Sequence, residues 1–207
     1  MDKLDLTKAD KVYYTAKTKP QILYIGETHY LSITGKGDPS EQVFSDKIQV
    51  LYATAYVIKF MCKALNHDFV VPKLEGLWSF DEEKYKLISM EEAPLKIPRS
   101  EWNYRLMIRM PDFVTREQVE EATAIVINKK GIKAASTIEF YEMTEGKVIQ
   151  ILHVGPFANE PETLKKIQEF TSENNLQKNG IHHEIYLSDF RKTSPDKLKT
   201  ILREPVK

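Results

Sequence analysis

The chain has 207 residues and equal numbers of basic and acidic side chains, 30 Lys and Arg against 30 Asp and Glu, so its formal net charge is zero. Because nucleic-acid binding depends on an excess of basic side chains, this balance argues against a nucleic-acid partner. The length suffices for a buried core without disulfides. No apolar run approaches the roughly 20 residues that cross a bilayer, and the start lacks the apolar core of a signal peptide, so we expect a cytoplasmic protein without a membrane segment.

Strand and helix patterns alternate in the first half of the chain. Residues 21–28 and 30–35 are rich in β-branched and aromatic side chains and predict strands. From residue 41 to 66 apolar side chains recur every three or four positions, which predicts one long amphipathic helix. The segment around Glu75 and residues 102–110 predict two more strands, so the order is β-α-β-β.

The second half repeats much of this order. Thr115 and Gln118 have the spacing of a capping box, which predicts that a helix begins there and ends before Gly131. The remaining predicted elements are two strands at 136–143 and 148–155 joined by a hairpin turn at 144–147, a helix at 161–175, a strand around Glu184 and a helix at 195–202.

Each half therefore contains a strand with a glutamate among apolar and aromatic residues. In an extended strand alternate residues share a face, so Glu184 shares one with His182 and Tyr186 while His183 points the other way. Glu75 shares a face with Leu77. A carboxylate in apolar surroundings binds protons more tightly and suits acid or base chemistry. The alternatives are a cross-strand ion pair or a solvated side chain for Glu184, and pairing with the nearby Lys73 for Glu75.

Four segments carry a resemblance to a known family: His182–Asp189, Leu74–Trp78, Leu152–Phe157 and Pro195–Leu202. Together they resemble the stand-alone GyrI-like (gyrase-inhibitor-like) small-molecule-binding proteins. The resemblance covers nearly the whole chain and is most specific in the last third. Two positions depart from the pattern, because Ser79 stands where an aromatic residue is expected and Phe190 where proline is expected.

The resemblance implies an α+β fold in which two β-α-β-β units (an SHS2-type dyad) pack about a pseudo-twofold axis with a central ligand groove. We therefore expect a single domain over residues 1–207, with pseudo-repeats at roughly 20–112 and 133–190 and a C-terminal helix at 195–202. Related domains form the effector-binding halves of multidrug-responsive transcription activators. Here strand-like sequence begins within about twenty residues of Met1, so we expect no DNA-binding helix-turn-helix.

Some stand-alone members of the resembled family hydrolyse cyclopropane-bearing DNA-alkylating compounds by opening the strained ring with water. The resemblance thus implies binding of planar aromatic molecules, followed by hydrolysis that detoxifies them. The alternative is a non-catalytic protein that sequesters drugs or modulates DNA gyrase. The candidate catalytic residues are Glu184, Glu75 and Tyr141. The candidate ligand-binding residues are Trp78, Trp102, Tyr186, His153 and His182.

We expect neither a cofactor nor a metal ion. His182, His183 and Glu184 offer metal-binding atoms close together in sequence, but neighbouring strand residues point to opposite faces and cannot reach one ion without distortion. His153 has a simpler interpretation as a hydrogen-bonded strand residue. Periodicity alone would place both tryptophans, Trp78 and Trp102, in the core.

Overall fold

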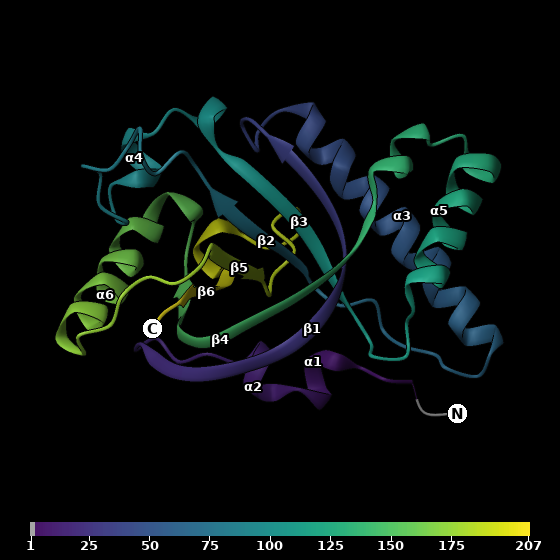
Figure 1. The fold of residues 1–207 in the computed structure, drawn as a ribbon, viewed down its shortest axis with the longest axis horizontal. Coiled ribbons are helices and arrows are strands. Elements are labelled where there is room, and N and C mark those ends of the chain that lie inside the picture. Colours follow the sequence, from purple (N-terminus) through teal and green to yellow (C-terminus); the bar gives the residue numbers. More distant parts are fainter. Residues whose placement is uncertain (1–2) are drawn as a thin grey trace.

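Six antiparallel strands close into one barrel in the computed structural model, which describes residues 3–207 (Figure 1). The strands are β1 (Gln21–Lys36), β2 (Leu74–Ser79), β3 (Asn103–Met110), β4 (Glu139–Val154), β5 (His182–Tyr186) and β6 (Lys199–Pro205). Their order around the barrel is β1-β3-β2-β5-β6-β4. Each half of the chain contributes three strands, and the halves meet where β1 pairs with β4 and β2 pairs with β5. The α+β class is confirmed, whereas the pseudo-twofold relation of the halves stays a prediction.

Helices cover the barrel on two sides (Figure 1). The long α3 (Gln42–Ala64) and α5 (Arg116–Lys130) pack against each other on one side, and α6 (Glu160–Glu173) lies against β4 on the other. These three helices confirm the helical periodicities, and Thr115 forms the predicted capping box with Gln118. The short helices are α1 (Leu6–Ala9), α2 (Lys11–Tyr14) and α4 (Ala93–Lys96). Within residues 3–207, none of the helices combines the length and apolar character that a membrane span requires.

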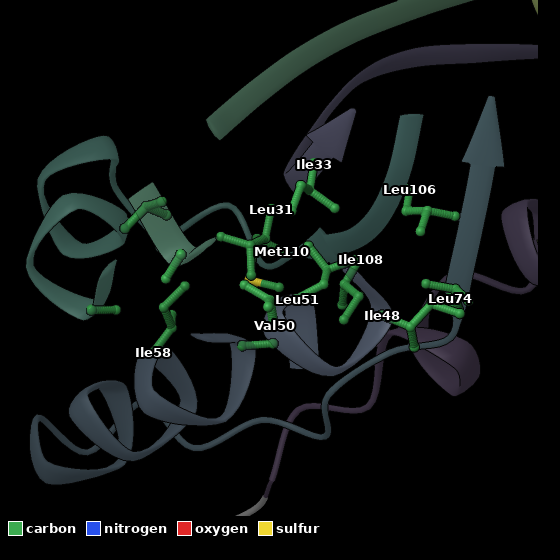
Figure 2. Packing of buried hydrophobic residues seen from close by; sticks show 14 of the residues in the cluster. Leu31, Ile33, Ile48, Val50, Leu51, Ile58, Leu74, Leu106, Ile108 and Met110 are labelled. Atoms are coloured by element: carbon green, nitrogen blue, oxygen red, sulfur yellow. The ribbon is translucent and has the colours of Figure 1, made fainter. Parts of the chain in front are cut away.

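The largest core lies between α3 and the outer side of β1 and β3 (Figure 2). Ile48, Leu51 and Ile58 recur on one face of α3 at helical spacing, and all three are buried. They meet Leu31 from β1 and Ile108 from β3, both fully buried. This packing fixes the two-strand wall of the barrel against α3.

The hairpin predicted at residues 144–147 is wrong. β4 runs unbroken through this segment and pairs with β1 along most of its length, from Glu139 opposite Ser32 to Gln150 opposite Gln21. Gly146 has a φ of 69°, so it bends the strand without reversing it. The two predicted strands at 21–28 and 30–35 are likewise one strand, β1.

The helix predicted at residues 195–202 is also wrong. Only a short turn of 3-10 helix forms at Pro195–Lys197, and Lys199–Pro205 is strand β6. β6 hydrogen-bonds to β5 on one side and to β4 on the other, so the barrel closes through it. The conformation of this segment is therefore determined by pairing with the edges of β4 and β5. Local sequence signals do not reveal such pairing with distant strands.

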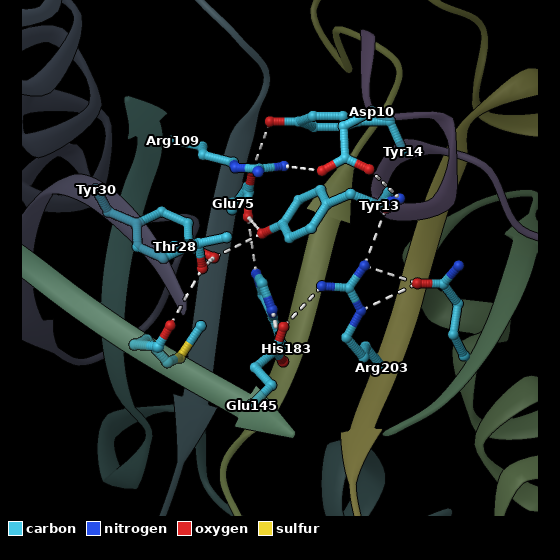
Figure 3. A network of polar contacts seen from close by, with 12 residues as sticks. Asp10, Tyr13, Tyr14, Thr28, Tyr30, Glu75, Arg109, Glu145, His183 and Arg203 are labelled. Carbon is cyan, nitrogen blue, oxygen red and sulfur yellow. Dashed lines mark hydrogen bonds and ion pairs between the residues drawn. The ribbon is translucent and has the colours of Figure 1, made fainter. Parts of the chain in front are cut away.

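The inside of the barrel holds a buried network of charges (Figure 3). The His183 ring donates from Nε2 to Glu75 and from Nδ1 to Glu145, both at 3.0 Å. Arg203 donates to the second oxygen of Glu145 at 2.7 Å and to the Gln150 side chain. The side chains of His183, Glu75 and Arg203 are all 0% exposed. Two carboxylates thus face two cations, which is the condition under which charges can be buried.

The N-terminal segment covers the buried network around Glu75. Tyr13 on α2 donates its hydroxyl to Glu75 at 2.5 Å, and the Tyr14 hydroxyl reaches the other oxygen at 3.3 Å. The guanidinium of Arg109 lies 4.3 Å from the Tyr13 ring centre and binds Asp10 at 2.8 Å. Glu75 is therefore shielded from solvent by tyrosines, and within residues 3–207 it forms no ion pair with Lys73, the partner that the alternative interpretation gave it.

Replacing Arg203 by Met should lower the free energy of unfolding by about 3–5 kcal/mol, because the Glu145 carboxylate loses its guanidinium partner while it stays buried. Urea unfolding measures this loss. The matched control is Arg191→Met, since Arg191 pairs with Asp189 on the surface and should cost at most about 1 kcal/mol. Equal losses in the two variants would contradict a stabilising role of the buried network.

The same network predicts how stability depends on pH. Burial alone would raise the pKa of Glu145, but His183 and Arg203 lower it to about 2, so its contribution is present above pH 4.5 and is lost as the pH falls toward 2. Burial would lower the pKa of His183, but Glu145 and Glu75 raise it above 6.5, so its contribution is present below pH 6.5 and is lost at higher pH.

We therefore expect the free energy of unfolding, measured by urea titration at a series of pH values, to be largest between pH 4.5 and 6.5. In Glu145→Gln the decline on the acid side should become shallower, because the group with the depressed pKa is gone. A wild-type profile that rises steadily through pH 6.5 would contradict the assignment of a protonated His183.

Candidate functional site

The two glutamates of the sequence analysis lie on opposite faces of the sheet. In the pairing of β2 with β5, Glu75 is opposite Ile185 and Gly76 is opposite Glu184. Residues directly opposite each other share a face, so Glu75 points into the barrel and Glu184 points out of it. Leu202, which is opposite Glu184 on β6, packs in the cluster under α6 and confirms that this is the outer side. The expectation that both glutamates meet in one central groove is wrong.

The polar and aromatic side chains on this outer side form what we call the outer-face cluster. Its members are Trp78, Glu160, His182, Glu184, Tyr186 and Glu204. They come from β2, β5, β6 and the first turn of α6. The predicted alternation of β5 is confirmed, because His182, Glu184 and Tyr186 are half-buried here while His183 and Ile185 face the interior.

Aromatic rings form one part of the cluster. The indole Nε1 of Trp78 donates to the Tyr186 hydroxyl at 2.9 Å. Beneath them lies Gly76, where a Cβ atom would come within 2.9 Å of that Nε1 and 3.1 Å of that hydroxyl. A glycine at this position therefore lets both rings lie close to the strand. Phe44 of α3 stacks on Trp78, and Phe157 meets Tyr186 edge-on.

Charged groups form the other part of the cluster. His182 lies between two carboxylates, with its Nδ1 2.5 Å from Glu204 and its Nε2 3.5 Å from Glu184. Burial alone would lower the pKa of His182, but the charges of Glu204 and Glu184 raise it to about 10. The imidazole is therefore cationic at neutral pH and places a positive charge beside the carboxyl group of Glu184, whose side chain is 13% exposed.

Glu160 has the opposite character. It is the first residue of α6, it is buried, and its Oε1 has no hydrogen-bond partner among residues 3–207. Burial and the charge of Glu184 raise its pKa well above the usual range, although His182 opposes this effect. Glu160 and Glu184 thus lie in surroundings of different charge within one cluster, which is an arrangement that can separate an acid role from a base role.

The other predicted site residues lie elsewhere or at the margin. Trp102 meets Trp78 edge-on and extends the aromatic part. Tyr141 faces the interior beside Tyr30 and lines a pocket of about 550 Å³ at one end of the barrel, so it does not join Glu184. His153 lies under α6, where Thr163 at 2.8 Å and the carbonyl of Pro156 at 3.2 Å occupy both ring nitrogens.

One group of side chains has the spacing of metal ligands. Donor atoms of Glu27, His29 and Glu142 lie within 4.8 Å of one another on β1 and β4. Arg116 already holds Glu142 at 3.0 Å, and Glu27 is exposed, so an ion-pair network on the surface accounts for this trio. It shares no residue with the outer-face cluster.

Two members of the cluster, Glu160 and Glu204, were missed by sequence reasoning. A glutamate at the start of a helix is ordinarily explained by its favourable interaction with the helix dipole, so Glu160 gave no signal of its own. Glu204 lies just beyond the residues that were expected to be helical. Only the pairing of β5 with β6 and the packing of α6 bring them beside His182.

The sequence matches the family model of the GyrI-like small molecule binding domain over residues 18–207. A crystal structure of an uncharacterized conserved protein from Listeria innocua is similar over 99% of this chain and 100% of its own, with 36% identity and a TM-score of 0.88. Two hydrolases from Listeria innocua are also similar. One has 38% identity and a TM-score of 0.86 over the full length of both chains. The other has 37% identity and a TM-score of 0.84 over 99% of this chain and 100% of its own.

The C-terminal domain of EcmrR shares the fold at 12% identity, with a TM-score of 0.57 over 91% of this chain and 97% of its own. No functionally curated protein matches the sequence. The family match covers both glutamate strands and every member of the outer-face cluster. The chain therefore belongs to the GyrI-like small-molecule-binding family.

Proposed function

We propose that this protein binds planar aromatic small molecules at the outer-face cluster and hydrolyses those that carry a strained, electrophilic ring. The observation that carries the proposal is the placement of Glu184 next to the Trp78 and Tyr186 rings on one face of β2 and β5. Aromatic rings offer stacking surfaces to a flat molecule, and a neighbouring carboxylate attracts a cationic or electrophilic group. Family membership supports a small-molecule ligand.

Hydrolysis is supported by the chemistry of the cluster. Glu184 lies beside the cationic His182 and is only slightly exposed, so its carboxylate can act as the base that takes a proton from water. In the proposed reaction this water attacks the least hindered carbon of a cyclopropane fused to a planar ring system. The hydrolase names of two Listeria innocua relatives, at 37% and 38% identity, agree with a reaction of this general class.

Glu75 has no part in this proposal, in contrast to the sequence-based expectation. Its oxygens already accept hydrogen bonds from Tyr13, Tyr14 and His183, and its side chain is fully buried. A reacting water would have to displace these partners. Glu75 therefore serves the barrel, and the chemistry is assigned to the outer side.

The variant Glu184→Gln should lower the turnover of a cyclopropane-bearing alkylator by about 10²–10⁴-fold, because the amide keeps the shape of the side chain but cannot accept the proton. Mass spectrometry follows the gain of one water by the compound. Binding of the compound, measured by calorimetry with the intact protein, should persist in the variant. The matched control is Glu169→Gln on the exposed face of α6, which should retain the wild-type rate.

Turnover at the wild-type rate in Glu184→Gln would refute the catalytic assignment. Binding by the wild-type protein without any gain of water would favour the alternative, a protein that sequesters planar compounds without chemistry. Absence of both binding and turnover with planar aromatic cations and alkylators would refute the proposed site.

A further inference from the structure

Glu160 is a carboxyl group of the outer-face cluster that has no role in the proposed reaction and, unlike Glu184 and Glu204, no ion pair with His182. It occupies the first position of α6, directly after the 3-10 turn Phe157–Asn159 whose Phe157 ring meets Tyr186. The residue is 8% exposed, and its Oε1 is buried without a hydrogen-bond partner among residues 3–207. A buried polar atom left unpaired in this way is destabilising, so its retention calls for an explanation.

The surroundings of Glu160 show which form of the carboxyl group they accommodate. Glu184 and His182 are its charged neighbours, and His182 is already shared by the carboxylates of Glu184 and Glu204. No cation in the described part of the chain forms an ion pair with Glu160. A second negative charge beside Glu184 would therefore be uncompensated, whereas a neutral acid fits.

We propose that Glu160 is the catalytic acid that complements Glu184: its carboxyl proton goes to the oxygen of the substrate on which negative charge develops as the ring opens. This inference rests on the proposed hydrolysis and adds a residue to it. The carboxyl group of Glu160 is assigned to meet the substrate oxygen, because no hydrogen bond from residues 3–207 occupies its Oε1. Such donation stabilises the charge that grows in the transition state.

Glu184 takes a proton from water, and the water oxygen forms a bond to the cyclopropane carbon. The carbon–carbon bond of the ring breaks, and its electron pair moves through the conjugated ring to the carbonyl oxygen, which becomes a phenolate. Glu160 gives its proton to this oxygen and becomes a carboxylate. Proton transfer from Glu184 to Glu160, directly or through solvent, restores both groups, so the net change is addition of one water.

His182 and Glu204 give Glu160 and Glu184 different electrostatic surroundings. The cationic Nε2 of the imidazole lies 3.5 Å from a carboxyl oxygen of Glu184 and can compensate a negative charge there. Glu204 accepts a hydrogen bond from the other ring nitrogen and fixes the orientation of the imidazole. Glu160 lacks an ion-pair partner of this kind, so the proton of the cluster stays on Glu160 while Glu184 is the base.

The test compares Glu160→Gln with the wild-type protein in two measurements. The first is infrared spectroscopy of the folded protein without ligand near neutral pH, where a protonated carboxylic acid gives a band distinct from carboxylates. We expect this band in the wild type and its loss in Glu160→Gln. The control Glu162→Gln, an exposed glutamate in the same helical turn, should keep the band.

The second measurement is turnover of the cyclopropane-bearing alkylator as a function of pH. Glu160→Gln should lower the rate by about 10²-fold or more and should abolish the decline of the wild-type rate at alkaline pH, where the acid loses its proton. Thermal unfolding checks that the variant is folded. Glu160→Asp, which keeps a carboxyl group, should recover part of the rate if the group donates a proton.

The outcomes separate this inference from the proposed function. If Glu184→Gln loses turnover while Glu160→Gln keeps the wild-type rate and pH profile, Glu160 is not the acid and the hydrolase assignment stands. If the infrared band is absent from the wild type, the inference fails even where turnover is observed. If the wild-type protein adds no water to the alkylator, the proposed function fails and the role of Glu160 fails with it.

Discussion

The interaction on which this structure most depends is the one that His183 makes inside the barrel. Its ring joins Glu75 of β2 to Glu145 of β4, and Arg203 of β6 joins Glu145 to Gln150. These contacts connect strands from both halves of the chain across the barrel interior. Because the charged groups are fully buried, loss of one partner leaves another without compensation. The network therefore holds the strands in one register.

That register decides where the chemistry can occur. Side chains alternate across each strand, so a β5 register that turns His183 inward must turn His182, Glu184 and Tyr186 outward. The inward side is dense with paired charges and tyrosine hydroxyls, and it is closed by α2. The outward side has aromatic rings, a carboxylate beside a cationic histidine, and a buried acid at the start of α6. The inward face of β5 thus contributes to stability, and its outward face carries the residues proposed to bind and react with ligands.

Much of this fold could be predicted from the sequence. The long helix, the capped helix after Thr115 and the alternation of β5 follow from periodicity and local hydrogen bonding, and the structure confirms them. The failures share a cause: β4 and β6 take their form from partners distant in sequence. The sequence around Gly146 is typical of a turn, but β1 pairs with β4 on both sides of this residue. The segment predicted to be helical up to residue 202 instead pairs with β4 and β5 as strand β6.

The candidate site was predictable to a smaller extent. Alternation put His182, Glu184 and Tyr186 on one face and the family resemblance added Trp78, and the structure brings these four side chains together. Glu75 was placed with them because its sequence context resembles that of Glu184, but a pattern match does not specify which face of the sheet each strand presents. Glu160 could not be found, because its surroundings are created by tertiary packing of α6 on the barrel.

The central claim is that ligands bind outside the barrel, at the outer-face cluster, and that the charged interior is structural. A crystal structure of the protein in complex with a planar aromatic cation, such as ethidium, tests it most directly. We expect the ring system to contact Trp78 and Tyr186 with its charge near Glu184, while the contacts of His183 with Glu75 and Glu145 stay intact. A ligand inside the barrel against Glu75, with Tyr13 and Tyr14 displaced, would contradict this account.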